Sequence, residues 1–282
     1  MESKIRKIYK QAQDELESKW QKDMLLSFNE IESIESEIDI LKKSGSKAQL
    51  EKKQDELQKK KREILMHDAH YKAMVEQTTE KLAHANDIAI KYINNEMPDI
   101  YTINYNDAYK DAVKGIKGIS YELVDESTVK FLVNNDKLQL PKKSLNKRKD
   151  MRWNAKQINS SILQGILQGE SIDKMSERIL PIVNNNESAS VRTARTLTTQ
   201  CENKGRLDRI ENLSEQGLII EKTWVATNDD RTRDSHAELD GETVPYDEPF
   251  SNGLMYPGDP DGEPEEVYNC RCTMVTNIIG KK

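Results

Sequence analysis

The stretch that decides how this chain is classified lies near its C-terminus: Trp224-Val-Ala-Thr-Asn-Asp-Asp-Arg-Thr-Arg-Asp-Ser-His236, then Leu239-Asp240-Gly241, then Asn269-Cys270-Arg271-Cys272. Two cysteines one residue apart, an upstream histidine and many aspartates are not the composition of an ordinary hydrophobic core. The pattern predicts a small, loop-rich unit whose shape is fixed by polar contacts or by a metal ion.

His236, Cys270 and Cys272 carry the side chains that bind zinc in proteins. The motif is incomplete, because zinc sites usually show paired ligands on both sides and here one side has a single histidine. The alternative, which we favour, is that the cysteines are small buried residues and His236 anchors a loop by hydrogen bonds. Zinc is the candidate cofactor. A fourth ligand could come from Asp229, Asp230, Asp234 or Cys201.

The clustered carboxylates allow a second interpretation, since such groups bind magnesium or calcium and support phosphodiester chemistry. Their spacing does not match a calcium-binding loop. Arg231 and Arg233 are interleaved with them, which favours internal ion pairs. The alternative function to be weighed is a metal-dependent nucleic-acid-processing enzyme using Asp229, Asp230 and His236. The carboxylates are Asp229, Asp230, Asp234 and Asp240.

Charge is unevenly distributed along the 282 residues, whose formal net charge is -6. Residues 223–282 hold 13 acidic and 5 basic side chains, a net of -8, and the rest of the chain has a net of +2. The chain is therefore not basic enough to be a dedicated nucleic-acid-binding protein. Arg192, Arg195 and Asn203 on a predicted helix could contact phosphate, but pairing with the acidic C-terminal region is favoured.

One basic run follows Pro141, and a solvated linker is favoured over a phosphate-binding patch there. A secretory leader is not expected, and no run approaches the ~20 apolar residues of a membrane span. Three cysteines, two of them too close for an easy disulfide, favour a reducing compartment. The candidate DNA contacts of the basic run are Lys142, Lys143, Lys147, Arg148 and Lys149.

Apolar residues at steps of three or four predict a long helix over residues 3–42, ended by Gly45. A second helix is predicted over 47–96 and stopped by Met97-Pro98. One row of apolar residues recurs every seven positions along this helix, as in a coiled coil. The second row that a coiled coil needs becomes apolar only late, at Val75, Leu82 and Ala89. The hairpin either packs on itself and the body or serves as an oligomerisation or partner-docking arm.

Further helices are predicted over 151–168, from an N-cap at Ser171 to Pro181, and over 187–216 with Gly217 as its cap. Short β-like runs and turns follow. The fold class is therefore α+β, with a long N-terminal helical hairpin, a mainly helical middle and a small loop-rich C-terminal domain. The predicted domains are a hairpin arm at 1–97, a mixed segment with the basic linker at 98–150, a helical body at 151–217 and the C-terminal domain at 218–282.

The C-terminal motif extends beyond its cysteines and histidine to eight residues that we take as structural: Trp224, Asp229, Arg231, Arg233, Asp240, Gly241, Asn269 and Arg271. With Phe250 and Pro257-Gly258-Asp259-Pro260, they resemble the phage head morphogenesis family, the minor head proteins of tailed phages similar to Mu protein F. The resemblance covers roughly residues 150–275 and is most specific in the last fifty.

This resemblance implies a structural minor capsid protein that binds the portal and is packaged in the virion interior, after assembly in the host cytoplasm. It implies roles in head morphogenesis and in DNA packaging or ejection, and no catalysis. The implied partners are the portal protein, then scaffold or major capsid protein and double-stranded DNA, with no membrane. Many relatives carry Cys-x-x-Cys at Arg233-x-x-His236, and a histidine where this chain has Val267-Tyr268. Of that fuller ligand set, at most His236, Cys270 and Cys272 remain.

Overall fold

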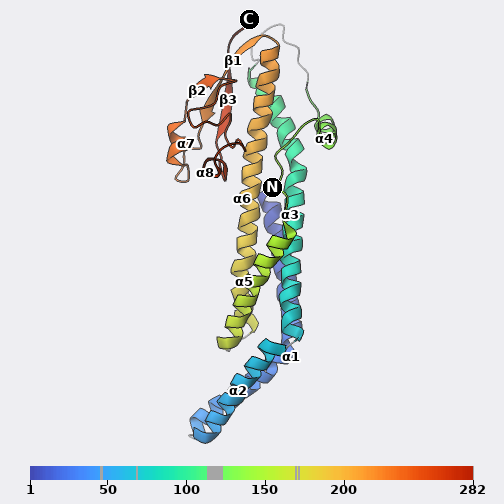
Figure 1. The fold of residues 1–282 in the computed structure, drawn as a ribbon, viewed down its shortest axis with the longest axis vertical. Helices are drawn as coiled ribbons and strands as arrows, with labels where there is room; N and C mark the ends of the chain where they lie inside the picture. Colours follow the sequence, from blue (N-terminus) through green and yellow to red (C-terminus); the bar gives the residue numbers. More distant parts are fainter. Residues whose placement is uncertain (45–46, 68, 113–122, 169, 171, 282) are drawn as a thin grey trace. The chain divides into compact units, whose positions relative to one another are not determined.

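The computed structural model describes residues 1–44, 47–67, 69–112, 123–168, 170 and 172–281. The chain clusters into two compact units, one made of Glu2–Ala89 with Leu145–Ser190 and the other of Met1, Ile90–Ser144 and Val191–Lys282. Among the described residues, the regular secondary structure of the first unit is helical, and the second unit adds a small antiparallel sheet (Figure 1). The predicted α+β class is confirmed. None of the helices within the described ranges combines the length and apolar character of a membrane span.

The helical unit begins with α1 (Glu2–Ser44) and α2 (Lys47–His67), which run antiparallel as a hairpin (Figure 1). Ion pairs join the two helices, with Lys53 2.7 Å from Glu37 and Lys61 3.1 Å from Glu35. The first predicted helix is confirmed. The cap predicted at Gly45 lies outside the described residues.

The second predicted helix is wrong in its extent. Residue 68 lies outside the described residues, and after it α3 (Ala69–Ala112) continues through the predicted stop at Pro98. An internal proline costs about 3 kcal/mol. Burial of Ile93, Met97 and Tyr101 offsets this, since a buried side chain of that size contributes about 1.5–3 kcal/mol. The prediction that the second row becomes apolar late in the helix is confirmed, because Leu82 and Ala89 are fully buried.

The helical unit is completed by α5 (Lys147–Gln168) and by the start of α6 (Ile172–Glu215). The sequence predicts that a helix ends at Pro181, but α6 runs through it because Ile179, Ile182 and Val183 are buried around it. The helices predicted on either side of Pro181 are therefore one. The N-cap predicted at Ser171 lies outside the described residues, whereas Gly217 ends α6 with φ +90° as predicted.

A buried polar network joins α1, α3, α5 and α6 inside this unit. The Tyr9 hydroxyl lies 2.5 Å from Asn86 Oδ1 and 2.7 Å from Ser190 Oγ. Asn86 Nδ2 donates to the Asp150 carboxylate and, at 2.8 Å, to Asn186 Oδ1. Burial raises the pKa of Asp150 above its usual value. Because each of these groups needs its partner, the network specifies how the four helices align.

The second unit contains the end of α3, the short helix α4 (Glu126–Asn134), the end of α6 and a sheet in the order β2-β1-β3. Central strand β1 (Leu218–Val225) pairs antiparallel with β2 (Thr243–Pro245) and β3 (Thr273–Lys281). Residues 129–133, whose sequence pattern fits either a strand or a helix, lie in α4. Two short helices complete the unit: α7 (Asp234–Glu238) and α8 (Pro264–Val267).

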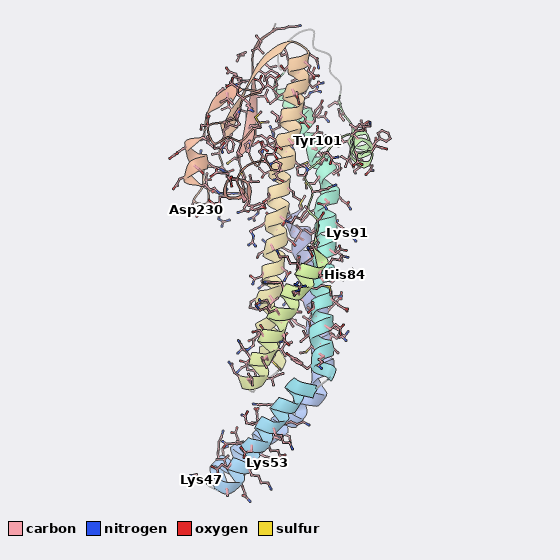
Figure 2. All side chains as sticks on the ribbon, viewed as in Figure 1. Lys47, Lys53, His84, Lys91, Tyr101 and Asp230 are labelled. Atoms are coloured by element: carbon pink, nitrogen blue, oxygen red, sulfur yellow. The ribbon has the colours of Figure 1, made fainter. Side chains whose placement is uncertain are left out.

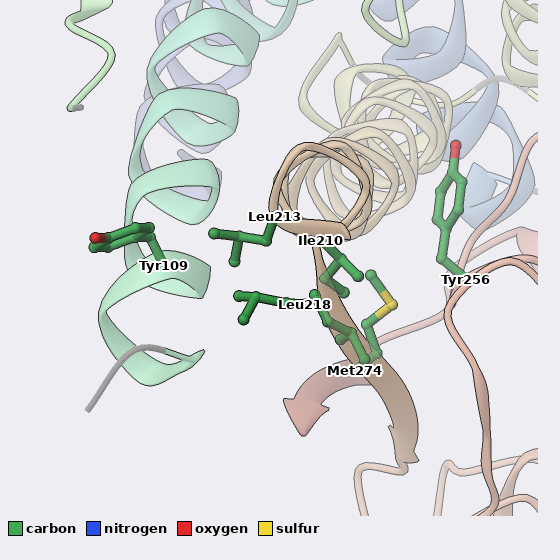
Figure 3. Close-up of a cluster of buried hydrophobic side chains, with 7 residues drawn as sticks. Tyr109, Ile210, Leu213, Leu218, Tyr256 and Met274 are labelled. Atoms are coloured by element: carbon green, nitrogen blue, oxygen red, sulfur yellow. The ribbon is translucent and has the colours of Figure 1, made fainter. Parts of the chain in front are cut away.

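Residues of α3, α6 and the sheet share a hydrophobic cluster that fixes β1 against α6 (Figure 3). Its fully buried members include Ile210 and Leu213 of α6 and Met274 of β3. Alternate residues of β1 face the interior, and one of them is Lys222. Its ammonium donates to the Tyr246 and Met255 carbonyls at 2.9 and 2.8 Å, and burial lowers its pKa to about 8.

We predict that Asn86→Ala destabilises the helical unit by about 1–3 kcal/mol, because it leaves buried partners unpaired. Denaturant unfolding of the full chain followed by circular dichroism measures this. Asn95→Ala, at a less buried position of the same helix, is the control and should change stability by less than about 0.5 kcal/mol. Equal effects of the two substitutions would contradict the importance of the network.

Candidate metal centre

The candidate centre is formed by two segments that are distant in sequence. His236 lies on α7, and Cys270 and Cys272 precede β3. All three side chains are buried, with exposed fractions of 1%, 1% and 4%. His236 Nδ1 lies 3.4 Å from Cys272 Sγ and 3.7 Å from Cys270 Sγ. In the described parts of the chain, these residues form the group of histidine, cysteine and acidic side chains able to hold a metal.

A residue that sequence reasoning missed completes the environment of His236. Glu266, on α8, places Oε2 2.8 Å from His236 Nε2, the ring nitrogen that faces away from the sulfurs. The contact is an ion-pair distance rather than an aligned hydrogen bond, since Nε2 has no hydrogen-bond partner of standard geometry within the described residues. Ser235 Oγ lies 3.1 and 3.2 Å from the two Glu266 oxygens and so fixes the carboxylate.

The two cysteines differ in their proton affinity. A hydrogen bond from Cys270, followed by the nearby His236 ring, holds the pKa of the Cys272 thiol well below its usual value. The same hydrogen bond to Cys272, together with burial, raises the pKa of Cys270. Such a pair beside an imidazole nitrogen is suited to a soft cation.

Aromatic packing closes the other side of His236. The Trp224 ring, on β1, meets His236 and Phe250 edge to face, with centroid separations of 5.3 and 5.2 Å. Trp224 and both cysteines belong to one hydrophobic cluster with Leu239. The cysteine side chains are therefore held in an apolar environment rather than at the surface, which strengthens any electrostatic interaction that they make.

The main chain that carries the cysteines is held by three side chains of α6. Thr196 Oγ1 accepts from Asn269 N at 2.8 Å, and Thr199 Oγ1 donates to Cys270 O at 2.7 Å. Asn203 Nδ2 donates to Cys272 O at 3.2 Å, and its Oδ1 accepts from Met274 N at 3.1 Å. We call these three residues, Thr196, Thr199 and Asn203, the α6 polar row. Their spacing of three and four residues puts them on one helical face.

The family comparison agrees with the motif. The model of the family described as Phage Mu protein F like protein matches residues 156–275. Residues 156–275 are therefore similar to that family, and we call them the Mu F-like region. The resemblance predicted from the sequence is thereby confirmed, and the matched range contains the α6 polar row as well as the candidate centre.

Two relatives match beyond the Mu F-like region. Minor head protein GP7 of Bacillus phage SPP1 is 26% identical over 198 residues, which cover 68% of this chain and 63% of that protein. NAD(+)--arginine ADP-ribosyltransferase EFV of Enterococcus faecalis (strain ATCC 700802 / V583) is 29% identical over 184 residues, covering 61% of this chain and 38% of that protein. The chain thus spans only part of each relative. No solved structure matches it significantly.

The carboxylates of the Mu F-like region make internal contacts. Asp229 forms a two-point ion pair with Arg271, at 2.5 and 2.6 Å, rather than with the interleaved Arg231 or Arg233. The Arg271 guanidinium holds the Asp229 pKa well below its usual range. Asp240 accepts from Ala226 N at 2.8 Å, so it fixes the turn that follows β1.

The other predicted ligands do not join His236 in a metal-binding group within the described residues. Asp230 is exposed in the loop before α7 (Figure 2), and Asp234 lies at the start of α7. Cys201 is buried on α6, where its thiol donates to Met97 O at 3.1 Å. Asp229, Asp230 and His236 therefore do not form a metal-binding group among the described residues.

The remaining motif residues have backbone or packing roles. Gly241 and Asn269 have positive φ values of 83° and 62°, in the left-handed region where residues other than glycine and asparagine are strained. Arg233 donates to the Tyr268 carbonyl, which ties the start of α7 to the end of α8. Arg231 is exposed, and its main-chain N–H donates to Asp229 at 3.0 Å.

The candidate DNA contacts lie at the surface. Lys142 and Lys143 precede α5, and Lys143 is held by Asn94, which contacts its main chain through bonds of 2.9 and 3.0 Å. Lys147, Arg148 and Lys149 form the first turn of α5. Arg192 is exposed on α6. Asn203 contacts the acidic C-terminal region, as the sequence favoured, through the main chain of residues 272 and 274.

We predict that Asn203→Ala loosens the segment that carries the cysteines. The substitution leaves several buried main-chain groups without partners, at a cost of about 1–3 kcal/mol. Hydrogen exchange on the full chain should show faster exchange at residues 269–274. The control, Asn185→Ala at an exposed position of α6, should leave those amides unchanged. Unaltered protection in Asn203→Ala would show that this side chain does not hold the segment.

Proposed function

We propose that this chain is a structural minor head protein of a tailed phage, bound to the portal and packaged inside the head. The observation that carries the proposal is the Mu F-like region at residues 156–275. The similarity to Minor head protein GP7 supports it, because that match extends over 68% of this chain. Assembly would take place in the host cytoplasm, and the mature protein would lie in the virion interior.

The way the Mu F-like region uses its polar residues supports a structural role. Asp229 is neutralised by Arg271, Asp240 caps main-chain and amide donors, and Asn203 binds carbonyl and amide groups of the backbone. Each of these side chains therefore holds the fold of the Mu F-like region in place. The match to a protein named as an ADP-ribosyltransferase covers 38% of that protein and gives no basis for assigning its activity to this chain.

The long helices are the elements that we assign to contacts with other head components. The hairpin of α1 and α2 presents exposed charged side chains, and its inner apolar residues include Ile31 and Ile38. A helical arm of this kind can dock against a larger ring through its side chains. The portal is the proposed partner, with scaffold or major capsid protein as further contacts during head morphogenesis.

The portal assignment predicts the composition of the particle. Quantitative mass spectrometry of purified mature virions should find the chain at low copy number, and procapsids assembled without portal should lack it. The comparison uses the major capsid protein in the same samples as an internal standard. Absence from virions and from portal-containing procapsids would rule out a head component, and its retention without portal would rule out the portal as its docking partner.

The basic run at the surface supports contact with double-stranded DNA during packaging or ejection. Replacing Lys142, Lys143, Lys147, Arg148 and Lys149 by Gln should weaken DNA binding by the full chain. Because each lysine or arginine on a phosphate displaces counterions, the salt slope should fall by about 0.9 for every phosphate that the variant no longer neutralises.

The matched control for the DNA experiment removes an equal number of exposed lysines from the hairpin, at Lys42, Lys43, Lys47, Lys52 and Lys59. It should leave both affinity and salt slope unchanged, as measured by fluorescence anisotropy over a range of salt concentrations. An equal reduction in the two variants would indicate a general charge effect. No binding by the unmodified chain would leave the run as a linker.

A further inference from the structure

The buried group of His236, Cys270 and Cys272 has no explanation in the proposed head function. We propose that these residues bind a zinc ion through His236 Nδ1 and the two sulfur atoms, and that Glu266 positions the histidine from its other side. The candidate ligand atoms all lie within 4.8 Å of one another. The inference is independent of the head function, because it concerns how the Mu F-like region is stabilised.

The spacing of the ligand atoms matches a tetrahedral zinc site. Zinc binds sulfur at about 2.3 Å and imidazole nitrogen at about 2.0–2.1 Å, so a tetrahedral angle separates the nitrogen and sulfur ligands by about 3.5 Å. The two nitrogen–sulfur distances in the structure are 3.4 and 3.7 Å. Both nitrogen–sulfur distances are therefore those expected of a zinc ion bound by His236 Nδ1 and the two sulfurs.

The orientation of the histidine fits the same conclusion. Histidine ligands usually direct their second ring nitrogen at a carboxylate or carbonyl, which fixes the ring and raises its basicity. Here Nδ1 faces the sulfurs and Nε2 lies 2.8 Å from Glu266. Ser235 in turn contacts both oxygens of that carboxylate. The ring is thus held with Nδ1 toward the cysteines.

The donor set selects the metal. Two sulfurs and one imidazole favour zinc over magnesium or calcium, which prefer oxygen ligands. The described residues supply three ligands, so we assign the fourth tetrahedral position to a water molecule. The charge of the ion would be balanced by the Cys270 and Cys272 thiolates, which lie together in an otherwise apolar cluster.

Zinc binding would join α7 to the segment before β3. His236 and Cys270 are 34 residues apart in sequence, and the metal would close that loop in the folded state. The α6 polar row already fixes the Cys270 and Cys272 main chain, so the ion adds a link between that segment and α7. A metal that binds only the folded chain stabilises it by mass action.

The test is the metal content of the full chain purified under reducing conditions without chelators. Elemental analysis should find about one zinc ion per chain, the content of a single site. Cys272→Ser should contain none. The matched control is Cys201→Ser, which removes the third cysteine at a buried position outside the cluster and should retain zinc.

A second variant keeps the test decisive if Cys272→Ser does not fold. Glu266→Gln keeps all three ligands and should weaken zinc affinity about 10- to 100-fold, measured by competition with a chromophoric chelator. Glu265→Gln, at the exposed neighbouring position, is its control and should bind zinc normally. Replacing zinc by cobalt(II) should produce thiolate-to-cobalt charge-transfer absorption in the unmodified chain and in Cys201→Ser, and none in Cys272→Ser.

Three results would overturn the proposal. One is a folded, reduced chain that neither contains zinc nor takes it up when zinc is added. Another is equal zinc content in Cys272→Ser and Cys201→Ser, which would place the metal elsewhere. The third is a disulfide between Cys270 and Cys272 in the protein as isolated from cells, detected by mass spectrometry, since it would remove both thiolate ligands.

Discussion

The constraint on which the C-terminal region depends is the contact between the α6 polar row and the main chain of residues 269–274. Thr196, Thr199 and Asn203 bind the backbone of that segment and so hold its main chain against α6. Asn269, with φ +62°, starts the segment and sets its direction. Because β3 follows directly and pairs with β1, the same contacts also align the sheet on α6.

This arrangement separates two tasks within the Mu F-like region. Backbone contacts place the segment, which leaves the Cys270 and Cys272 side chains to fill the cluster beside Trp224 and His236. Ion pairs and carboxylate caps then fix the exposed loops, as Arg271 does for Asp229. The proposed zinc site would use side chains that the packing already brings together, and the proposed head function requires only that the resulting surface keeps its shape.

The sequence predicts the elements that periodicity controls and misses those that depend on tertiary packing. Apolar residues at helical spacing identify α1, α5 and the late part of the second apolar row. Pro98 and Pro181 mislead, because buried neighbours compensate for the hydrogen bond that each proline removes. The ligand-type residues could be found from their chemistry, whereas Glu266 could not, since its role depends on α8 folding back beside α7. The α6 polar row could have been recognised from its spacing of three and four residues. Nothing in the strand pattern indicated that Lys222 would be buried.

Crystallography of the full chain with anomalous diffraction at the zinc edge tests this account most directly. We predict an anomalous peak bonded to His236, Cys270 and Cys272, in a segment whose main chain is hydrogen-bonded to the α6 polar row. A structure in which residues 269–274 are detached from α6 would contradict the account of how the region is held. A structure with the segment in place and no peak would contradict the zinc site alone.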